Sequence, residues 1–332
     1  MNNLNTTTPI KDEKPFAVID NSLLQGICKL PTEKSDVLIQ ILKEKYRVVA
    51  TPTLVEEILV SFYERDATEK PALQKMLKAI QEMLLFEEPL ELIFREFILG
   101  ENIRANFQLN SHMAKMLGDV VGNPDSLSAE APQWIIERRQ EKTERLQART
   151  EYQCLMKEKN DEASRIFPNH AAFMERVIFQ LGVEIDGSSE LKICRLNRYL
   201  GSFIKRRHPD CEELTQKAFI EATFDELDKT RFTRNYLLTE LLYDWAVICK
   251  VTNEFNQPIK ILDDKKQIND EDDQQYVASA LVCSRLLTCD KGMSSIAGFF
   301  SERKLWAGKP VYIPRDKIEK FENLEELEHY LV

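Results

Sequence analysis

The sequence of 332 residues lacks any long apolar run, so we expect no membrane-spanning helix, which needs about 18 or more such residues. The first residues, 1–14, are polar and carry both charges, unlike a secretory signal. Only 10 glycines and 13 prolines occur, too few for a collagen-like or linker-dominated chain. These absences favour an ordinary globular protein.

Cysteine and histidine are too few and too scattered to predict a zinc site. The seven cysteines include no Cys-x-x-Cys pair, and the four histidines lie far apart. We therefore expect free thiols in a reducing cytoplasm.

Several catalytic signatures are also missing. The sequence contains no GxxxxGK[ST] loop, no GxGxxG and no GxSxG. An aspartyl phosphatase would need a second Asp two residues after Asp20, where Ser22 stands. Cys289 is next to Asp290, whose negative charge disfavours a reactive thiolate. Nucleotide-loop, dinucleotide, serine-hydrolase and thiol chemistries are therefore not expected.

The composition allows a buried core but not a generally basic surface. Hydrophobic residues make up 43% and charged residues 30% of the chain, and the net charge is −10. A protein that coats nucleic acid needs clustered Lys and Arg to neutralise phosphates. Any nucleic-acid site must therefore be local.

Short apolar runs near both ends of the chain indicate a parallel α/β sheet, because such runs are closed by turn residues and alternate with helical patterns. The predicted strands are Phe16–Ile19, Arg47–Ala50, Arg285–Thr288 and Val311–Ile313. Between them the spacing of apolar residues is helical, including a pattern that runs to Leu84.

This organisation predicts an α/β domain interrupted by a large all-helical insertion. We expect a disordered tail over 1–14, the first half of the domain over 15–66, the insertion over 67–254 and the second half over 255–332. A long insertion is tolerable because closing a longer loop adds little entropic cost.

Four acidic residues stand where a parallel sheet would bring them together. Asp20 and Asp290 end predicted strands, and Glu57 and Asp273 lie in the helical segments that accompany them. Ligands of open α/β sheets bind beyond the carboxyl ends of the strands. Crowded carboxylates suit Mg²⁺ or Mn²⁺, and a pair of such ions can activate water for attack on a phosphodiester.

The segments that carry these acids resemble the motifs of PIN domains. They are Val18–Ser22, Thr53–Ile58, Asp273 with Ala280 seven residues later, and Leu286–Asp290. The resemblance implies a three-layer α/β/α sandwich with a central parallel sheet and a metal-dependent nuclease centre, most often acting on RNA. It covers residues 15–66 and 255–314, under half of the chain.

By this resemblance Asp20, Glu57, Asp273 and Asp290 would be catalytic and would bind the metal, with Ser22 and Thr288 as supporting hydroxyls. Two registers stay open: Glu56 competes with Glu57, and Asp272 competes with Asp273. The alternative function is a catalytically inactive scaffold of the same fold, whose insertion mediates protein assembly. A DNA substrate is a further alternative.

A basic segment within the insertion is the candidate nucleic-acid contact. Six basic residues lie there against one acid, and Tyr199 and Phe203 are interleaved among them, where they would stack on bases. The six are Lys192, Arg195, Arg198, Lys205, Arg206 and Arg207. A charged stretch over 137–151 predicts a long exposed helix, which is either only a solvated surface or an arm that would meet a regulatory protein partner.

Overall fold

The computed structural model describes the sheet, its helices and several pieces of the intervening region. The described residues are 14–64, 70–87, 89–101, 203–205, 207–211, 213–214, 232–239, 264–302 and 304–320, with single residues 133, 165, 172, 200, 243 and 330. Within these ranges no helix combines the length and apolar character needed to cross a membrane.

Five parallel strands form one sheet in the order β3-β2-β1-β4-β5. Their bounds are β1 Phe16–Ile19, β2 Arg47–Ala50, β3 Leu84–Leu85, β4 Arg285–Thr288 and β5 Lys309–Tyr312. The predicted α/β class with a parallel sheet built from both ends of the sequence is therefore confirmed. Strand β1 lies at the centre, paired on one side with β2 and on the other with β4.

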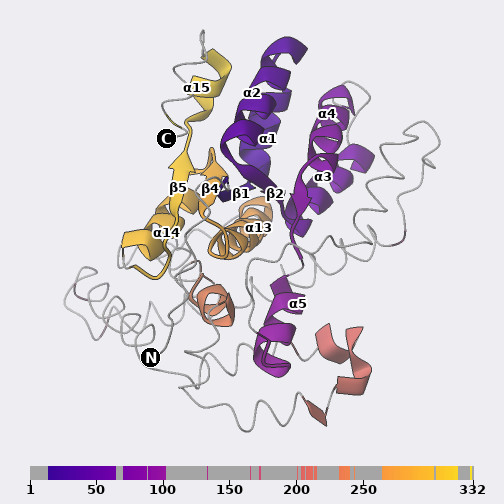
Figure 1. Ribbon diagram of the computed structural model, residues 1–332, viewed down its shortest axis with the longest axis vertical. Coiled ribbons are helices and arrows are strands. Elements are labelled where there is room, and N and C mark those ends of the chain that lie inside the picture. Colours follow the sequence, from indigo (N-terminus) through magenta and orange to yellow (C-terminus); the bar gives the residue numbers. More distant parts are fainter. Residues whose placement is uncertain are drawn as a thin grey trace, which may run out of the picture.

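Helices flank the sheet, and most of them connect neighbouring strands. Their bounds are α1 Asn21–Cys28, α2 Thr32–Lys45, α3 Pro52–Glu64, α4 Lys70–Gln81, α5 Pro89–Ile93, α13 Asp264–Ala280, α14 Lys291–Glu302 and α15 Arg315–Lys320, with a π-helix η1 at Phe94–Ile98 and a 3₁₀ turn η3 at Pro209–Cys211. In Figure 1, α1 to α4 and α15 gather on one side of the sheet, and α13 and α14 on the other.

The sheet takes one strand from the range assigned to the insertion. The helical pattern of the sequence continued to Leu84, but α4 ends at Gln81, and Leu84 and Leu85 pair with Val49 and Ala50 of β2. A two-residue strand inside the apolar run Met83–Phe86 is too short to show the period that separates a strand from a helix. The sheet therefore continues past the expected boundary at residue 66.

The core is formed where the central strands meet the helices. Ala17, Val18 and Ile19 of β1 and Leu286 and Leu287 of β4 are all completely buried. Strands covered on both faces are expected to read as continuous apolar runs, as these do. Burial of β1 from both sides fixes the positions of the residues that follow it.

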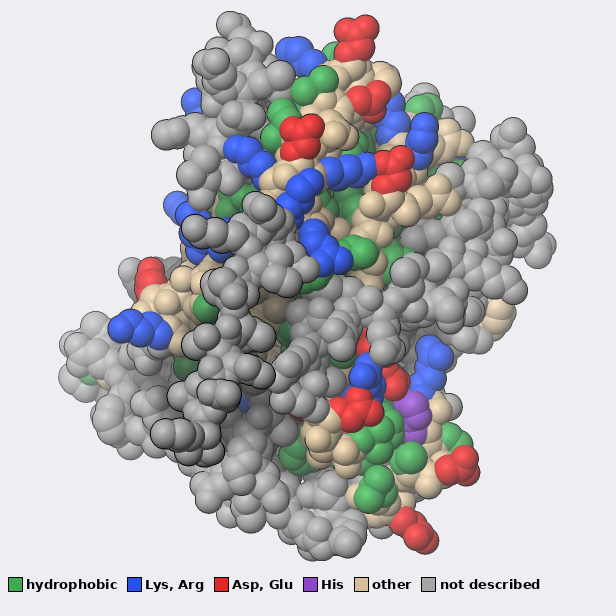
Figure 2. All heavy atoms as spheres, viewed as in Figure 1, with side chains coloured by type: hydrophobic (Ala, Val, Ile, Leu, Met, Phe, Trp, Pro, Cys, Tyr) green, Lys and Arg blue, Asp and Glu red, His purple; other side chains and the backbone are tan. Residues whose placement is uncertain are grey.

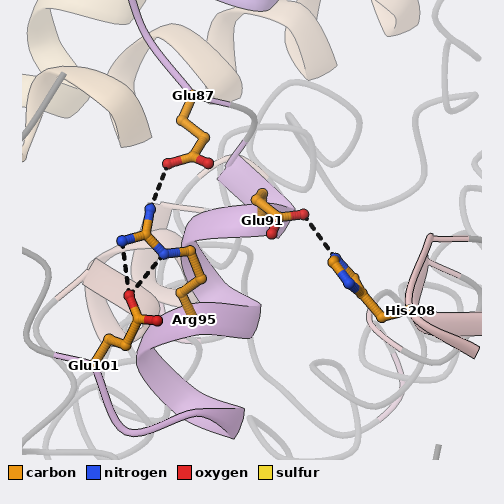
Figure 3. A network of polar contacts seen from close by, with 5 residues as sticks. All are labelled: Glu87, Glu91, Arg95, Glu101 and His208. Atoms are coloured by element: carbon orange, nitrogen blue, oxygen red, sulfur yellow. Dashed lines mark hydrogen bonds and ion pairs between the residues drawn. The ribbon is translucent and has the colours of Figure 1, made fainter. Parts of the chain in front are cut away.

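A polar cluster around α5 and η1 attaches part of the central region to the domain. Arg95 bonds both Glu87 and Glu101, with nitrogen-to-oxygen distances of 2.8 and 2.7 Å, and His208 Nε2 lies 2.9 Å from Glu91 Oε2 (Figure 3). The His208 ring also stacks on Phe94 at a centroid distance of 4.1 Å. These contacts hold the turn at residue 208 against the α5–η1 segment.

The buried carboxylate of Glu96 anchors a second piece, the helix over residues 232–239. It accepts hydrogen bonds from the backbone N–H groups of Phe232 and Thr233, at 3.0 and 2.7 Å, and from the Thr233 hydroxyl. A carboxylate at this place satisfies N–H groups that have no partner within a helix. The π-helix therefore carries the attachment point for this helix.

Gly308 occupies the tightest backbone site of the second half of the domain. A Cβ at this position would lie 2.4 Å from the Ser284 carbonyl oxygen and 2.4 Å from the Trp306 ring. Trp306 itself donates from Nε1 to the Cys283 carbonyl at 2.7 Å, which fixes the ring. The space beside Gly298, within α14, is open.

These two glycines predict opposite effects of the same substitution. Gly308→Ala should lower the free energy of unfolding by about 1–3 kcal/mol, because the new methyl group overlaps backbone and ring atoms. Gly298→Ala should raise it by about 0.5–1 kcal/mol, because alanine is favoured in a helix. Urea denaturation followed by circular dichroism measures both. Equal effects of the two substitutions would contradict the close approach at Gly308.

Candidate functional site

The strand order places the carboxyl ends of β1 and β4 side by side. From β1 the chain crosses to β2, whereas from β4 it crosses to β5 on the opposite side of the sheet. The connections therefore diverge between these two adjacent strands. Ligands of open α/β sheets bind at such a point.

Asp20 follows β1 directly and is almost fully buried, with 1% of its surface exposed. Its Oδ1 accepts the Leu23 N–H at 2.8 Å and caps α1. Its Oδ2 accepts hydrogen bonds from the hydroxyls of Ser22 at 2.6 Å and Thr288 at 2.7 Å. Both predicted supporting hydroxyls thus bond the carboxylate of Asp20.

The same two hydroxyls tie the carboxylate to the end of β4. Ser22 Oγ accepts the Cys289 N–H at 3.2 Å, and Thr288 Oγ1 accepts the Asp290 N–H at 2.8 Å. Because each oxygen accepts from the backbone, the hydroxyl proton is left to be donated to Asp20. This network fixes the two strand ends relative to one another.

Asp290 lies between the end of β4 and the start of α14 and is partly exposed. Its Oδ1 accepts the Met293 N–H at 2.7 Å, so it caps α14 as Asp20 caps α1. Asp20 and Asp290 thus follow adjacent strands, and each caps the helix that begins after it. The sequence pattern predicts that both acids lie at the carboxyl ends of neighbouring strands.

The pKa of Asp20 is affected by its burial and by its neighbours. Burial raises the pKa of the carboxyl from its ordinary value of 3.8 to about 6, and the nearby charge of Asp290 acts in the same direction. Hydrogen bonds from Ser22, Thr288 and Leu23 lower the pKa and compensate only in part. Ionisation of the Asp20 carboxyl is thus unfavourable, and a nearby positive charge would favour the ionised form.

Glu57 reaches the site from α3 through a tyrosine. The Tyr276 hydroxyl on α13 donates to Glu57 Oε2 at 2.5 Å. Tyr276 is 2% exposed, and its pKa is raised well above the ordinary value by burial first and then by the charges of Glu57, Asp20 and Asp272. This contact links Glu57 to a tyrosine on which the charge of Asp20 also acts, and it favours Glu57 over Glu56 as the candidate acid of α3.

The two candidate acids on α13 differ in burial. Asp272 is 9% exposed and acts electrostatically on Tyr276, whereas Asp273 is more exposed. Which of the two would be a metal ligand stays a prediction.

Tyr276 is the residue of the site that the sequence pattern did not identify. It falls on the apolar side of the α13 pattern and was expected to be a core residue. A buried tyrosine nevertheless needs a hydrogen-bond partner for its hydroxyl. That requirement, set beside two adjacent acids on one helix, was the only available signal.

The acids of this region have the right ligand chemistry for a hard cation but are not grouped around one point. Carboxylate oxygens such as those of Asp20, Glu57, Asp272 and Asp290 are the ligand type that Mg²⁺ and Mn²⁺ prefer. Next to Asp20, the Asn21 amide oxygen is buried and has no hydrogen-bond partner among the described residues. Across the described ranges, however, no three His, Cys, Asp or Glu side chains are grouped closely enough to hold an ion.

The predicted basic contact is described only in part. Lys205 and Arg207 are exposed, whereas Lys192, Arg195, Arg198 and Arg206 lie outside the described residues. The charged stretch 137–151 also lies entirely outside them. Phe203 is buried and lies near His208, so the expectation that it stacks on bases is wrong. Its apolar ring packs inward because it anchors the turn against η1.

The described surface carries no broad field of one sign on the face shown in Figure 2, where basic and acidic side chains are interspersed. On α2, for example, Lys34 and Lys43 lie among Glu33, Asp36 and Glu44. A phosphate backbone would therefore need a local contact rather than this face as a whole.

Cys289 lies beside the acids and is chemically quiet. Burial raises the pKa of its thiol to about 12, and Asp20 and Asp290 act in the same direction. The sequence indicates only the effect of the neighbouring Asp290, whereas burial has the larger effect on the pKa of this thiol. None of the four described cysteines, Cys28, Cys211, Cys283 and Cys289, forms a disulfide.

Comparisons with models of protein families, with curated proteins and with solved structures found no match for this chain. What the site does must therefore be argued from its residues.

The raised pKa of Asp20 predicts a specific pH dependence of stability. Because the folded pKa of about 6 exceeds the unfolded value of 3.8, the folded state binds an extra proton between these values. This stabilisation is complete below pH 4 and is lost as pH rises through 6. Relative to Asp20→Asn, the wild type should lose roughly 3 kcal/mol of unfolding free energy between pH 4 and 8.

Denaturation in EDTA at several pH values measures this difference. Asp36→Asn, an exposed acid on α2, serves as the control and should follow the wild type. Parallel curves for the wild type and Asp20→Asn would show that Asp20 ionises normally in the folded protein.

Proposed function

We propose that this protein is a divalent-metal-dependent endonuclease with a three-layer PIN-like domain, which hydrolyses phosphodiester bonds in RNA. The supporting features are the parallel sheet, the acids at the ends of β1 and β4, and the resemblance of the motifs around them. The cytoplasm is the proposed location.

One observation carries this proposal. Asp20 and Asp290 follow adjacent strands at the point where the chain connections diverge, and the pKa of Asp20 is raised chiefly by burial, with a smaller contribution from the charge of Asp290. A fold that required only a helix cap at each position would not need two mutually repelling acids there. A cation between them would turn this repulsion into attraction.

The chain's own residues have distinct roles in the proposal. Asp20, Asp290 and Glu57 would hold Mg²⁺ or Mn²⁺, together with an acid of α13. Ser22 and Thr288 keep Asp20 in one orientation by donating to its Oδ2. When bound, the metal supplies positive charge that activates a water and stabilises the developing charge of the phosphate.

Substrate selection is assigned to the insertion. Lys205 and Arg207 are exposed on the helical residues that precede His208, which contacts Glu91 of α5 and Phe94 of η1, and they would contact phosphates with the rest of the basic segment. The charged stretch 137–151 is the proposed contact for a regulatory protein. Single-stranded or structured RNA is favoured over DNA by the resemblance alone.

A second candidate is a scaffold of the same fold without catalysis. It is favoured by the finding that, among the described residues, no three potential ligands are grouped to hold an ion. On this alternative the acids only cap helices, and the insertion assembles partners. Charge reversal along Arg138–Arg149 would then abolish capture of the partner, while replacement of the acids would change nothing.

The nuclease proposal predicts the outcome of a cleavage assay. Labelled RNA, single-stranded DNA and duplex DNA are incubated with the full chain in Mn²⁺, Mg²⁺ or EDTA. We expect RNA cleavage in either metal and none in EDTA. Asp290→Asn and Glu57→Gln should each reduce the rate by about 100-fold or more, a loss of about 2.7 kcal/mol of transition-state stabilisation.

The matched control for Glu57→Gln is Glu44→Gln. Glu44 is an exposed acid of α2 that lies shortly before the start of β2, at the amino-terminal end of the strands, whereas Asp20 and Asp290 follow their carboxyl ends. It should retain full activity. Cleavage of DNA alone would change the substrate class, and no metal-dependent cleavage of any substrate would favour the scaffold.

A further inference from the structure

We propose that the amino-terminal edge of the sheet binds the phosphate backbone of a nucleic acid through the positive charges of Lys14, Arg47 and Arg285. These residues lie at the ends of the strands opposite to Asp20 and Asp290. The inference goes beyond the proposed function, because it requires neither a bound metal nor cleavage, and it uses none of the basic residues of the insertion.

Basic residues begin three of the four neighbouring strands β2, β1, β4 and β5. They are Arg47 on β2, Arg285 on β4 and Lys309 on β5. Arg47 pairs with Phe16, the first residue of β1. Arg285 pairs with Lys309, and Lys14 precedes β1 by two residues. Because neighbouring strands lie about 4.8 Å apart, these charges form a row of roughly 14 Å along one edge of the sheet.

The two arginines are held on the strands by neutral groups. Arg47 lies over the Phe16 ring, with its guanidinium carbon 4.4 Å from the ring centroid. Arg285 Nη1 donates to the Ser284 carbonyl at 2.7 Å, and its side chain also donates to the Tyr46 hydroxyl. An aromatic ring, a carbonyl and a hydroxyl fix the guanidinium groups without neutralising their charge.

Lys14 adds a third positive charge with a neutral partner, because its Nζ donates to the Lys43 carbonyl at 2.9 Å. Within the part of the chain that the structure describes, no carboxylate forms an ion pair with Lys14, Arg47 or Arg285. Lys14 and Arg47 are exposed, and Arg285 is partly exposed. The edge therefore presents positive charge to solvent in a chain whose net charge is −10.

The row of charges can be reached from both faces of the sheet. Arg47 is in register with Phe16, and Arg285 is in register with Ala17. Because successive residues of a strand point to opposite faces, the two arginines lie on either side of the edge. A chain of phosphates laid along the edge would therefore contact both guanidinium groups.

An extended chain of phosphates fits this edge better than a small anion or a protein surface. A single phosphate would contact only part of a row of roughly 14 Å. A nucleic-acid backbone carries closely spaced charges, and arginine matches phosphate oxygens with two parallel hydrogen bonds. None of the exposed large apolar side chains that the structure describes belongs to these strands, so the edge lacks the apolar centre of a protein interface.

The two ends of the strands carry opposite charges. Asp20 and Asp290 follow β1 and β4, each of which has four residues and is about 13 Å long. In the absence of a cation these acids repel phosphates. Binding measured in EDTA therefore reports on the amino-terminal edge and not on the acidic end of the strands.

The experiment measures binding of labelled single-stranded RNA and DNA to the full chain by fluorescence anisotropy, in EDTA and over a range of salt concentrations. Each contact with a phosphate of a single strand contributes about 0.7 to the slope of log K against log salt. We expect Arg47→Gln with Arg285→Gln to make this slope shallower by about 1.4 and to weaken binding at low salt by about tenfold or more. RNA and DNA should respond alike, because backbone contacts carry no sequence information.

Two controls separate the loss of charge from damage to the fold. Lys317→Gln removes an exposed lysine of α15, which follows the carboxyl end of β5, and it should leave the slope unchanged. Arg47→Lys with Arg285→Lys keeps both charges and should retain the slope of the wild type. Circular dichroism and thermal melts check that each variant is folded.

A folded double glutamine variant with the slope of the wild type would overturn the proposal, as would a wild type that binds neither nucleic acid in EDTA. If polyglutamate displaced the label as well as unlabelled RNA does at the same concentration of charge, the edge would be a site for acidic polypeptides instead. Binding of RNA at this edge without cleavage in any metal would leave the inference standing and would overturn the nuclease proposal alone.

Discussion

The buried carboxylate of Asp20 is the interaction on which the site depends. Removing an ionised carboxylate from water is costly unless it is hydrogen-bonded, and here the bonds come from α1, from Ser22 and from Thr288 of β4. One side chain thereby satisfies a helix start and joins two strands. These hydrogen bonds compensate for burial only in part, because burial keeps the pKa of Asp20 raised to about 6.

Around Asp20 the acids are arranged in two groups. Asp20 and Asp290 are joined by the Ser22 and Thr288 bonds at the ends of β1 and β4, whereas Glu57 is held by Tyr276. Asp272 and Asp20 both act on that tyrosine, so the second group lies within electrostatic reach of the first. The first group belongs to the sheet, and the second depends on how α13 packs. The distance between the two groups therefore depends on how α13 packs against β1 and α3.

The sequence was sufficient for the features that follow from short-range rules. The strands β1, β2 and β4 have the predicted bounds, and placing Asp20 and Asp290 together required only that both follow parallel strands. The short β3 was missed because two residues show no period. The contact of Tyr276 with Glu57 and the burial of Phe203 could not be predicted, because both depend on partners distant in the sequence.

The pairing of β1 with β4 has a consequence for biosynthesis. The Thr288–Asp20 bond joins residues 268 positions apart, and such long-range pairing forms late because distant segments must first meet. On a ribosome, Asp20 emerges long before Thr288, so the nascent chain contains β1 and β2 before the hydrogen bonds between the ends of β1 and β4 can form. The buried environment of Asp20 is therefore completed only after β4 has been synthesised and has paired with β1.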